Sequence, residues 1–469
     1  MPILTVTQNG KTETRTFAGP SLLSDLLAEF GYAVPHPCGG RGTCKKCSVL
    51  LNGTPVLACR TELAQDAAVT LPDRETISSA TGSQESGRLT ESVCLCLDIG
   101  TTTLALALVS LDDQAIIRTL TAPNPQRVFG ADVISRIDRC MKNGPQEQQT
   151  LLLEQVRGMI SDLLSQFGLQ KIDTLYVAGN TTMLHLFFGV DCSALGVAPY
   201  TPAFLESRTQ SGETLGLPAV KTVCALPGIS AFVGADIVAG LNFVGLPKDG
   251  KCRILLDLGT NAEIALFNGK KILCTAAAAG PCFEGANISC GMPASPGAVC
   301  AVEADGSFSV IGNEAPKGLC ATGLIDAVAE GVRREDIDET GFLEEDPLEI
   351  GPNVALTAAD IREFQLAKSA IRAATECLIK RANITFADVE GFYVAGGFSA
   401  GLKVKNAVYT GLFPEELQDK FHGINNASLL GTVRFACTQK ISAPLAGAEY
   451  VDLSADPQFS NLFMEYMMF

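Results

Sequence analysis

The sequence predicts two folded units: a small α+β unit at the N-terminus and a larger α/β unit with two similar halves. Three observations predict this organisation. A glycine-rich loop with three closely spaced cysteines lies between two predicted hairpins near the start of the chain, and a polar stretch follows them. Beyond that stretch, an apolar strand that ends in Asp, one apolar residue and Gly-Thr occurs twice. A repeated strand-and-turn pattern within an α/β unit indicates an internal duplication.

The composition favours a globular protein that does not bind nucleic acid. The chain has 469 residues, of which 47% are hydrophobic, and its formal net charge is −16. A large core is therefore possible, whereas binding to phosphate backbones depends on Lys and Arg. No signal peptide or membrane-spanning run is visible, and 17 cysteines without an export signal favour a reducing compartment. We expect a cytoplasmic protein with neither membrane nor nucleic-acid partners.

Residues 1–75 have the pattern of a small α+β unit. Two β-rich runs flank Asn9–Gly10, a dipeptide that favours a two-residue hairpin turn. The run SLLSDLLAEFG has helical apolar spacing and ends on Gly31, a common C-cap. A second hairpin is expected around Asn52–Gly53, and residues 68–73 read as a closing strand. This order of elements predicts a β-grasp fold.

Four cysteines in this unit have the spacing of an iron–sulfur site. Cys38, Cys44, Cys47 and Cys59 follow the pattern C-x5-C-x2-C-x11-C, with GGRGT between the first two. Thiolates hold such clusters, and glycines let backbone N–H groups turn toward the sulfur atoms. A structural zinc site usually has two Cys-x2-Cys pairs, and buried apolar cysteines are not expected in a glycine-rich loop. The favoured interpretation is a [2Fe–2S] cluster, with zinc as the alternative.

The cysteine spacing resembles that of plant-type and adrenodoxin-type ferredoxins. The fourth cysteine follows the third by only twelve positions, as in ferredoxin domains that are fused to larger redox enzymes. Residues 74–91 are rich in Ser, Thr and Gly and lack periodicity, which is typical of a linker. We therefore expect a ferredoxin-like domain at residues 1–75, a flexible linker at 76–91 and the larger domain at 92–469.

Two loops of the larger domain have the residues of a phosphate site. The runs LCLDIGTTT (95–103) and ILLDLGTNAEI (254–264) each place Asp at a strand end before Gly-Thr. Such a turn presents backbone N–H groups and a hydroxyl to phosphate oxygens, and the Asp can hold Mg²⁺. In YVAGGFS (393–399), two glycines would let a nucleoside lie against the backbone. The alternative is that these tight turns need glycine for shape alone.

The candidate site residues come from these three loops. Asp98 and Asp257 are the expected Mg²⁺ carboxylates. The expected phosphate-side and nucleoside-side residues are Gly100, Thr101, Thr102, Thr103, Gly259, Thr260, Asn261, Gly396 and Gly397.

The three motifs resemble the phosphate-1, phosphate-2 and adenosine motifs of the ATPase superfamily that includes actin, hexokinase and heat-shock chaperones. The resemblance implies two ribonuclease-H-like halves with ATP and Mg²⁺ in the cleft between them. By analogy with the general base of carbohydrate kinases in this superfamily, Asp236 could orient or deprotonate the attacking water. The alternative for Asp236 is a helix N-cap. Glu263 follows the second loop and could instead contact metal or water.

A ferredoxin fused to this ATPase module resembles the reductive activators of corrinoid proteins. The resemblance implies transfer of one electron from the cluster to an inactive Co(II) corrinoid of a methyltransferase system, such as one for O-demethylation. The product is Co(I), and ATP drives the uphill step. An upstream low-potential electron donor and a homodimer are implied as well. Further runs that carry the resemblance are NPQRVFGADVISRI (124–137), AGNTTMLHLFFG (178–189), APYTP (198–202), AGPCFEGANIS (279–289) and LTAADIREFQLAKSAI (356–371).

The sequence departs from the family pattern in two places. Only about 38 residues separate Cys59 from Asp98, so the middle domain of larger members is expected to be absent. The Gly-Ser of the family's Gly-x-Cys-Gly-Ser-Gly turn is replaced by Ala321–Thr322 in GLCATGLID. In this run, Gly318 and Gly323 resemble nucleotide contacts.

Other functions remain open at this point. An ATP-coupled electron donor to a different low-potential enzyme would resemble dehydratase activators, although these hold one cluster across a dimer and lack the N-terminal ferredoxin. A nucleotide-gated binding protein would use the ATPase fold only as a switch, and a small-molecule kinase would leave the ferredoxin unexplained. Cys94, Cys96 and His185 are expected to be buried structural residues.

Overall fold

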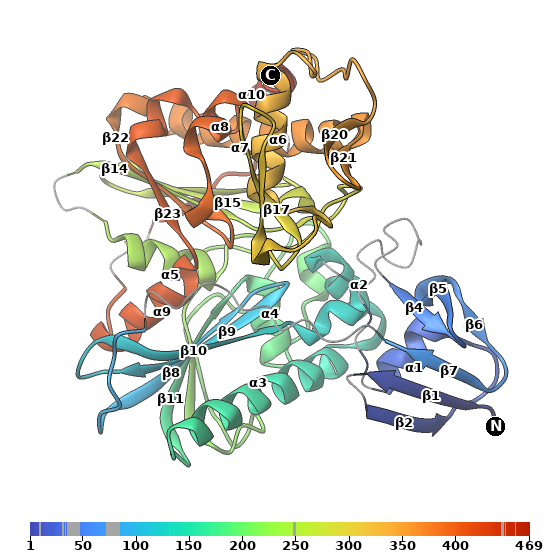
Figure 1. Cartoon of the computed structure of the whole chain (residues 1–469). Coiled ribbons are helices and arrows are strands. Elements are labelled where there is room, and N and C mark those ends of the chain that lie inside the picture. The colour runs from blue at the N-terminus through green and yellow to red at the C-terminus, as the bar shows by residue number, and fades with distance from the viewer. Residues whose placement is uncertain are drawn as a thin grey trace.

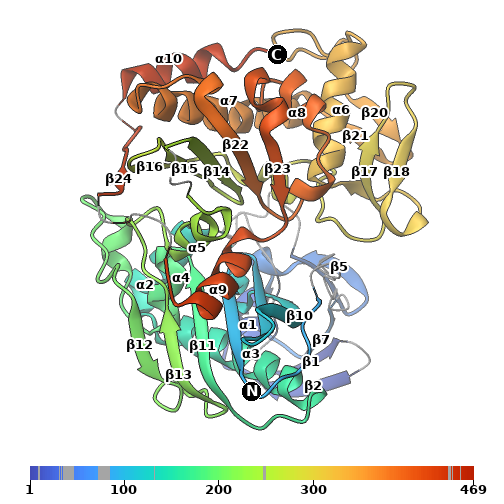
Figure 2. The ribbon, with the colours of Figure 1, turned by 90° about the vertical axis from the view of Figure 1, so that its left-hand side faces the viewer.

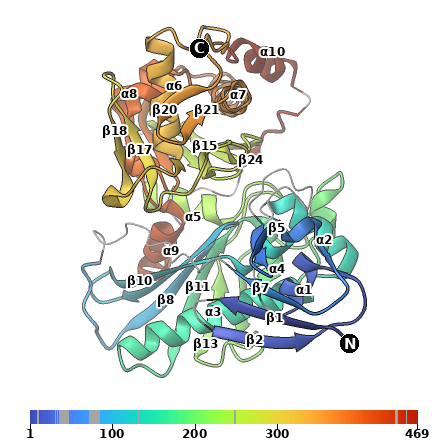
Figure 3. The same ribbon diagram turned by 45° about the vertical axis from the view of Figure 1, so that its right-hand side comes forward.

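The computed structural model describes residues 1–8, 11–30, 32, 34, 47–71, 85–130, 132–246, 250–441, 445, 447–454 and 456–469. The chain forms a small N-terminal unit and two larger lobes that stack on each other (Figure 1). The N-terminal unit lies beside the first lobe, as Figure 3 also shows. Among the helices of the described residues, none is long and apolar enough to cross a membrane.

The described part of the N-terminal unit contains a five-stranded sheet and the α-helix α1 (Leu23–Glu29). The strand order is β2-β1-β7-β4-β5, with β1 and β7 parallel in the middle. The predicted hairpin turn is confirmed at Asn52–Gly53, where φ is 50° and 82°. The core of the N-terminal unit is formed by apolar residues between Leu4 and Leu71. The predicted turn at Asn9–Gly10 and the predicted C-cap Gly31 lie outside the described residues. The strands are β1 (Ile3–Gln8), β2 (Lys11–Thr16), β4 (Ser48–Leu51), β5 (Thr54–Leu57) and β7 (Ala67–Thr70), and the short pair β3 (Ser21–Leu22) and β6 (Glu62–Leu63) stands apart.

The predicted linker is too long at its C-terminal end. The backbone N–H groups of Ser86 and Gly87 both donate to the Ile116 carbonyl, at 3.0 and 2.9 Å. Glu85 accepts a hydrogen bond from the Thr119 backbone at 2.9 Å. The physical reason is that β10 is an edge strand, whose free backbone groups accept an additional segment. Residues 85–91 therefore belong to the first lobe, and residues 72–84 lie outside the described residues.

The first lobe contains a six-stranded sheet in the order β10-β9-β8-β11-β13-β12. Helix α3 (Gln146–Gln166) buries its apolar stripe in the core of this lobe. The other helices are α2 (Val133–Asn143) and α4 (Thr181–Phe187). The strands are β8 (Val93–Ile99), β9 (Thr103–Ser110), β10 (Ala115–Pro123), β11 (Ile172–Gly179), β12 (Arg208–Ser211) and β13 (Val220–Ala225).

The second lobe has a sheet in the order β23-β22-β14-β15-β16-β24. Helix α7 (Ala358–Arg381) begins with a capping box of Thr357 and Asp360. Further helices of this lobe are α6 (Ala321–Arg333), α8 (Val404–Tyr409) and α10 (Pro457–Glu465). Strands β17 (Ala298–Val302) and β19 (Gly318–Leu319) belong to a smaller sheet. The main strands are β14 (Cys252–Leu258), β15 (Ala262–Phe267), β16 (Ile272–Ala277), β22 (Val389–Ala395), β23 (Phe421–Ile424) and β24 (Glu449–Tyr450).

The two large sheets share one arrangement over five strands. In each sheet, three antiparallel strands are followed by two parallel ones: β8, β9, β10, β11 and β13 correspond to β14, β15, β16, β22 and β23. Loops that follow β8 and β14 therefore occupy equivalent places. The α/β class of the larger domain is confirmed.

Two helices cross between the lobes (Figure 2). Helix α5 (Ala235–Val244) follows the last strand of the first sheet, and α9 (Ala427–Thr438) follows β23 of the second. Helix α9 nevertheless packs on the first sheet, where Leu429 and Val433 share a core with Cys94 and Cys96. The crossing is so close that a Cβ atom on Gly431 would lie 1.7 Å from the Ala239 carbonyl oxygen.

Candidate functional site

A cavity of about 1610 Å³ lies between the lobes and extends to the N-terminal unit. Both predicted phosphate loops and the predicted nucleoside loop line it, and so do the starts of α5 and α9. The structure therefore brings together Asp98, Gly100, Thr101, Thr102, Thr103, Asp236, Asp257, Gly259, Thr260, Asn261, Glu263, Gly396 and Gly397.

Asp98 is held by two residues from the beginning of α9. The Asn426 side-chain amide donates to Oδ2 at 2.8 Å, and the Ser428 hydroxyl donates to Oδ1 at 2.6 Å. Burial raises the pKa of Asp98, and these two hydrogen bonds act in the opposite direction because they favour the charged form. The carboxylate is thus fixed in direction.

Buried polar residues of the first lobe shape the loop after Asp98. Within the loop, the Gly100 N–H donates to the Thr103 carbonyl at 3.0 Å. The Asn124 amide donates to the Gly100 carbonyl at 2.9 Å, and the Arg136 guanidinium donates to the Thr101 carbonyl. Asn180 donates to the Thr101 hydroxyl at 3.1 Å. Carbonyl groups of the loop are thereby turned into the protein.

Arg136 and Asn124 hold the loop after Asp98 in place, and the sequence analysis did not single them out. Both side chains are fully buried, and burial lowers the pKa of Arg136 to about 9. Both residues occur in NPQRVFGADVISRI, the first of the resemblance runs. In this run Arg136 stands within the apolar segment VISRI, and a charged residue there was the available signal.

The loop after Asp257 is joined to the first loop by Glu284. The Thr260 hydroxyl donates to Glu284 Oε2 at 2.6 Å, and the Thr102 hydroxyl donates to Oε1 at 3.3 Å. Asp257 and Glu263 are direct cross-strand partners in β14 and β15, so their side chains lie on one face. The sequence reasoning did not single out Glu284, although it lies in the run AGPCFEGANIS.

Acidic side chains lie close together in the cavity. Burial raises the pKa of Asp236 to about 7, and the charge of Asp257 adds to this effect. Burial likewise raises the pKa of Asp257 to about 7, with a contribution from Asp98. Burial, together with the charges of Asp236 and Asp257, raises the pKa of Glu263 well above its usual range. Such a group of carboxylates favours a bound cation, because a cation offsets the mutual repulsion.

The donors suit a cation that retains water. Within the described residues, no three His, Cys, Asp or Glu side chains are arranged as a ready-made metal site. Mg²⁺ usually keeps several waters and takes only one or two carboxylates from the protein, so Asp98 and Asp257 suffice. Gly234 is the N-cap of α5 and Asp236 lies in the first turn, so the alternative that Asp236 is the N-cap is wrong.

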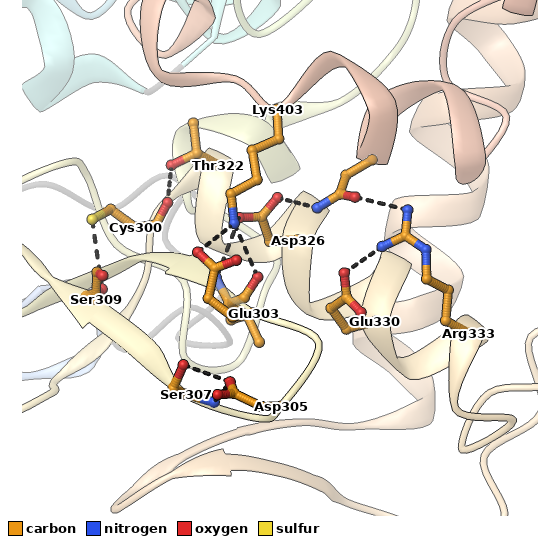
Figure 4. A network of polar contacts seen from close by, with 12 residues as sticks. Cys300, Glu303, Asp305, Ser307, Ser309, Thr322, Asp326, Glu330, Arg333 and Lys403 are labelled. Atoms are coloured by element: carbon orange, nitrogen blue, oxygen red, sulfur yellow. Dashed lines mark hydrogen bonds and ion pairs between the residues drawn. The ribbon is translucent and has the colours of Figure 1, made fainter.

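In the predicted nucleoside loop, a side chain would clash at Gly396 and would find open space at Gly397. A Cβ atom on Gly396, whose φ is 127°, would lie 2.6 Å from the Leu258 carbonyl oxygen, whereas a Cβ on Gly397 would meet nothing within 4 Å. Lys403 anchors the chain that follows, since it binds Asp326 at 3.0 Å and Glu303 at 2.8 Å (Figure 4). Asp326 is buried, whereas Lys403 and Glu303 are partly exposed, so only the Asp326 end of this anchor is shielded from water.

Gly318 and Gly323 do not belong to the residues that line the cavity. A Cβ atom on Gly318 would lie 2.2 Å from the Cys290 carbonyl oxygen, and one on Gly323 would lie 2.1 Å from that of Val299. Close packing of β19 and α6 requires both glycines. Ala321, which replaces the first residue of the family's Gly-Ser pair, lines the cavity instead.

Two of the four predicted cluster ligands lie within the described residues. Cys47 and Cys59 are buried, with 3.2 Å between their sulfur atoms. This separation is too long for a disulfide bond and is compatible with two thiolates on one metal centre. Cys38 and Cys44 lie outside the described residues. The donor set fits an iron–sulfur cluster, because thiolates are its usual ligands.

The residues expected to be structural are buried as predicted. His185 Nε2 accepts from the Ala203 N–H at 3.0 Å, while Nδ1 lies 2.7 Å from the Thr181 carbonyl oxygen. Burial lowers the pKa of His185, and its ring stacks on Phe204. Cys94 and Cys96 are buried under α9.

Comparisons with known proteins identify related families and relatives of this chain. A family model of the C-terminal domain of RACo, the ASKHA domain, matches residues 251–469, and one of the RACo middle region matches residues 93–249. The corrinoid activation enzyme RamQ of Eubacterium limosum is 30% identical over 419 residues, which are 80% of this chain and 70% of that protein. The Co(II) methylated amine-specific corrinoid protein reductase of Methanosarcina barkeri is 28% identical over 357 residues, or 68% of this chain and 65% of the relative.

A solved structure is similar over the whole chain. It is the reductive activator for a corrinoid, iron–sulfur protein, with a TM-score of 0.71 and 25% identity, and the match covers 100% of this chain and 98% of that one.

The expectation that the middle domain is absent is wrong. The model of the middle region matches residues 93–249, which are the first lobe together with α5. The short distance between Cys59 and Asp98 misled the prediction, because Asp98 already lies within the middle region rather than beyond it.

Proposed function

Since this chain belongs to the family of reductive activators of corrinoid proteins, we propose that it is an ATP-dependent enzyme that passes one electron to a corrinoid protein. The acceptor is inactive Co(II), and the product is Co(I) for methyl transfer. The observation that carries the proposal is the pair Asp98 and Asp257. They end equivalent strands of two equivalent sheets and face one cavity with Asp236 and Glu263.

The first unit is proposed to be the electron carrier. Its sheet order, with the first and last strands side by side in the middle, agrees with a β-grasp ferredoxin. Cys38, Cys44, Cys47 and Cys59 would hold the [2Fe–2S] cluster. Such a cluster supplies a one-electron carrier at about −400 mV in plant-type ferredoxins. The buried pair Cys47 and Cys59 would form the inner side of the site.

The cleft between the lobes is proposed to bind ATP and Mg²⁺. Asp98 and Asp257 would hold the cation from opposite lobes, and Thr101, Thr103 and Asn261 would face the phosphates. Gly396 and Gly397 would lie against the nucleoside, with Lys403 fixing the segment behind them. Asp236, whose pKa is about 7, can accept a proton from water near neutral pH.

Nucleotide binding must alter the electron-transfer equilibrium through the protein. For a one-electron step, each ~59 mV uphill lowers the equilibrium constant tenfold. ATP can offset this only if it favours the same state of the complex that the reduced acceptor favours. The crossing helices α5 and α9 suit such coupling, because each begins at the cavity and packs against both lobes. We also propose a cytoplasmic location, an upstream low-potential donor and a homodimer.

The test is the formation of Co(I) by the purified full-length chain. The reconstituted protein is mixed with a corrinoid protein of the kind that its relatives activate, a low-potential reductant and Mg-ATP, and the cobalt oxidation state is followed by absorbance. We expect Co(I) only when the protein, reductant and ATP are all present. Formation of Co(I) at an equal rate without ATP, or none on any corrinoid protein, would contradict the proposal. Reduction of a different low-potential enzyme would then favour the alternative acceptor.

A further inference from the structure

Glu284 is the one side chain among the described residues for which hydrogen bonds to both phosphate loops are seen. Thr102 belongs to the first lobe and Thr260 to the second, and 182 and 24 positions separate them from Glu284. The carboxylate also lines the cavity. It therefore joins the two lobes at the point where the two loops face each other.

The direction of these hydrogen bonds determines what each hydroxyl can do. A threonine hydroxyl has one proton to donate and two lone pairs to offer. Because Thr102 and Thr260 both donate to Glu284, their lone pairs can accept hydrogen bonds only from donors such as water. Phosphate oxygens, which are acceptors, would then be bound by other donors of the two loops, such as the Thr103 hydroxyl, the Asn261 amide and backbone N–H groups. Glu284 thus orients both hydroxyls in the same sense.

The segment that carries Glu284 also contacts the nucleoside loop. The short helix η4 (Pro281–Glu284) lies between Gly280 and Gly285, whose φ angles are 75° and 76°. The neighbouring Phe283 is buried and packs against Phe398 at a centroid distance of 5.7 Å. Phe398 directly follows Gly397, so the position of Glu284 is mechanically connected to the nucleoside end of the cavity.

We propose that Glu284 is a positioning residue that aligns the two phosphate loops across the cleft through Thr102 and Thr260. This inference rests on the proposed nucleotide site and adds the residue that sets its geometry. Glu284 acts through the two hydroxyls and not by direct contact with nucleotide or metal. A Gln at this position keeps the size but offers a single acceptor atom, so it cannot hold both hydroxyls in the same way.

The decisive experiment is a mutant cycle on ATP hydrolysis by the full chain. Glu284→Gln is compared in the wild type and in a Thr102→Val, Thr260→Val background. We expect Glu284→Gln to lower kcat/KM for ATP about tenfold in the wild type, a loss of about 1.4 kcal/mol, and less than twofold in the double-valine background. An equal loss in both backgrounds would overturn the proposal, since it would show that Glu284 acts without the threonines.

A second measurement separates alignment from metal binding. The Mg²⁺ concentration that gives half-maximal hydrolysis is expected to be unchanged in Glu284→Gln, while kcat falls. A large increase in that concentration would make Glu284 a metal ligand and overturn the inference. Glu314→Gln is the matched control, because Glu314 is on the surface, where it pairs with Lys317, and lies outside the cavity lining. Thermal melting of every variant verifies folding.

The outcomes also distinguish this inference from the proposed function. A cycle that behaves as expected in a protein that never forms Co(I) would retain the role of Glu284 and reject the corrinoid acceptor. Normal Co(I) formation with additive mutational effects would retain the corrinoid acceptor and reject the role of Glu284. A wild type without ATPase activity would overturn both.

Discussion

The carboxylate of Asp98 accepts a hydrogen bond from the Asn426 side chain at 2.8 Å, although 328 positions separate the two residues. Asn426 also caps α9, because its Oδ1 accepts from the Leu429 N–H at 2.7 Å. One side chain therefore fixes both the start of a helix from the C-terminal part of the chain and a carboxylate of the first phosphate loop. The position of Asp98 is therefore tied to the position of the first turn of α9.

Removal of the Ser428 hydroxyl tests this connection without disturbing the cap. Ser428→Ala removes a hydrogen bond that favours the charged form of Asp98, so the pKa of Asp98 rises further. We expect the acidic limb of the ATPase pH profile to move to higher pH and kcat at pH 7 to fall several-fold. Thr438→Ala, at the exposed end of α9, is the control. Identical pH profiles for Ser428→Ala and the wild type would contradict the assignment.

The raised pKa values predict a stability that depends on pH. Asp236 and Asp257 have folded-state pKa values of about 7 against an ordinary value of 3.8. The folded protein binds more protons than the unfolded chain between these values, so stability is lost as pH rises from about 4 through 7. In EDTA, we expect Asp257→Asn to raise Tm at pH 8 by several degrees and to change it little at pH 5.

Mg²⁺ should reproduce part of that effect in the wild type, because a cation offsets the repulsion among these carboxylates. Asp112→Asn, an exposed position in a turn of the first lobe, serves as the control. If Asp257→Asn lowers Tm at pH 8, the carboxylate is stabilising, and the electrostatic account of the cavity is wrong.

Loss of a cluster ligand should separate the two activities of the chain. Cys59→Ser is expected to remove the visible absorption, the iron and the labile sulfide, and to abolish Co(I) formation while ATP hydrolysis remains. Cys300→Ser, in β17 of the second lobe, should retain the cluster. Zinc without iron in protein purified under anaerobic conditions would favour the alternative metal site.

The helix crossing predicts a strong effect of one methyl group. Gly431→Ala places a Cβ atom 1.7 Å from the Ala239 carbonyl oxygen, and overpacking of this kind typically destabilises by about 1–3 kcal/mol or more. Gly158→Ala is the control: it lies within α3 and a Cβ atom there meets nothing within 4 Å. That exchange should stabilise by about 0.5–1 kcal/mol. Comparable melting temperatures for both variants would show that the crossing tolerates separation of α5 and α9.

Several features could be predicted from the sequence because they depend on neighbouring residues. The Asn52–Gly53 turn requires positive φ at both positions, and that preference is a property of the dipeptide. Helix α7 begins at its capping box for a similarly local reason. The aspartates and threonines of the two loops were found because the same short pattern occurs twice.

Other features could not be predicted, because they depend on contacts between distant parts of the chain. No local pattern marks Glu284 as the partner of Thr102, or Asn426 as the partner of Asp98. The sequence analysis expected the middle domain to be absent and did not recognise the first lobe as the middle region. It also placed residues 85–91 in the linker, because the sequence does not show that they join the edge strand β10.

The sequence by itself determined the classes of the two units, the duplicated loops and the types of residue available for chemistry. These depend on backbone preferences and periodicity within a few residues. Only the tertiary structure decided which carboxylates share the cavity, that Gly318 and Gly323 serve packing, and that α9 returns to the first lobe. The physical reason is that the crossing of α5 and α9 is set by the packing of two whole sheets, and this packing places the starts of both helices beside Asp98 and Asp257.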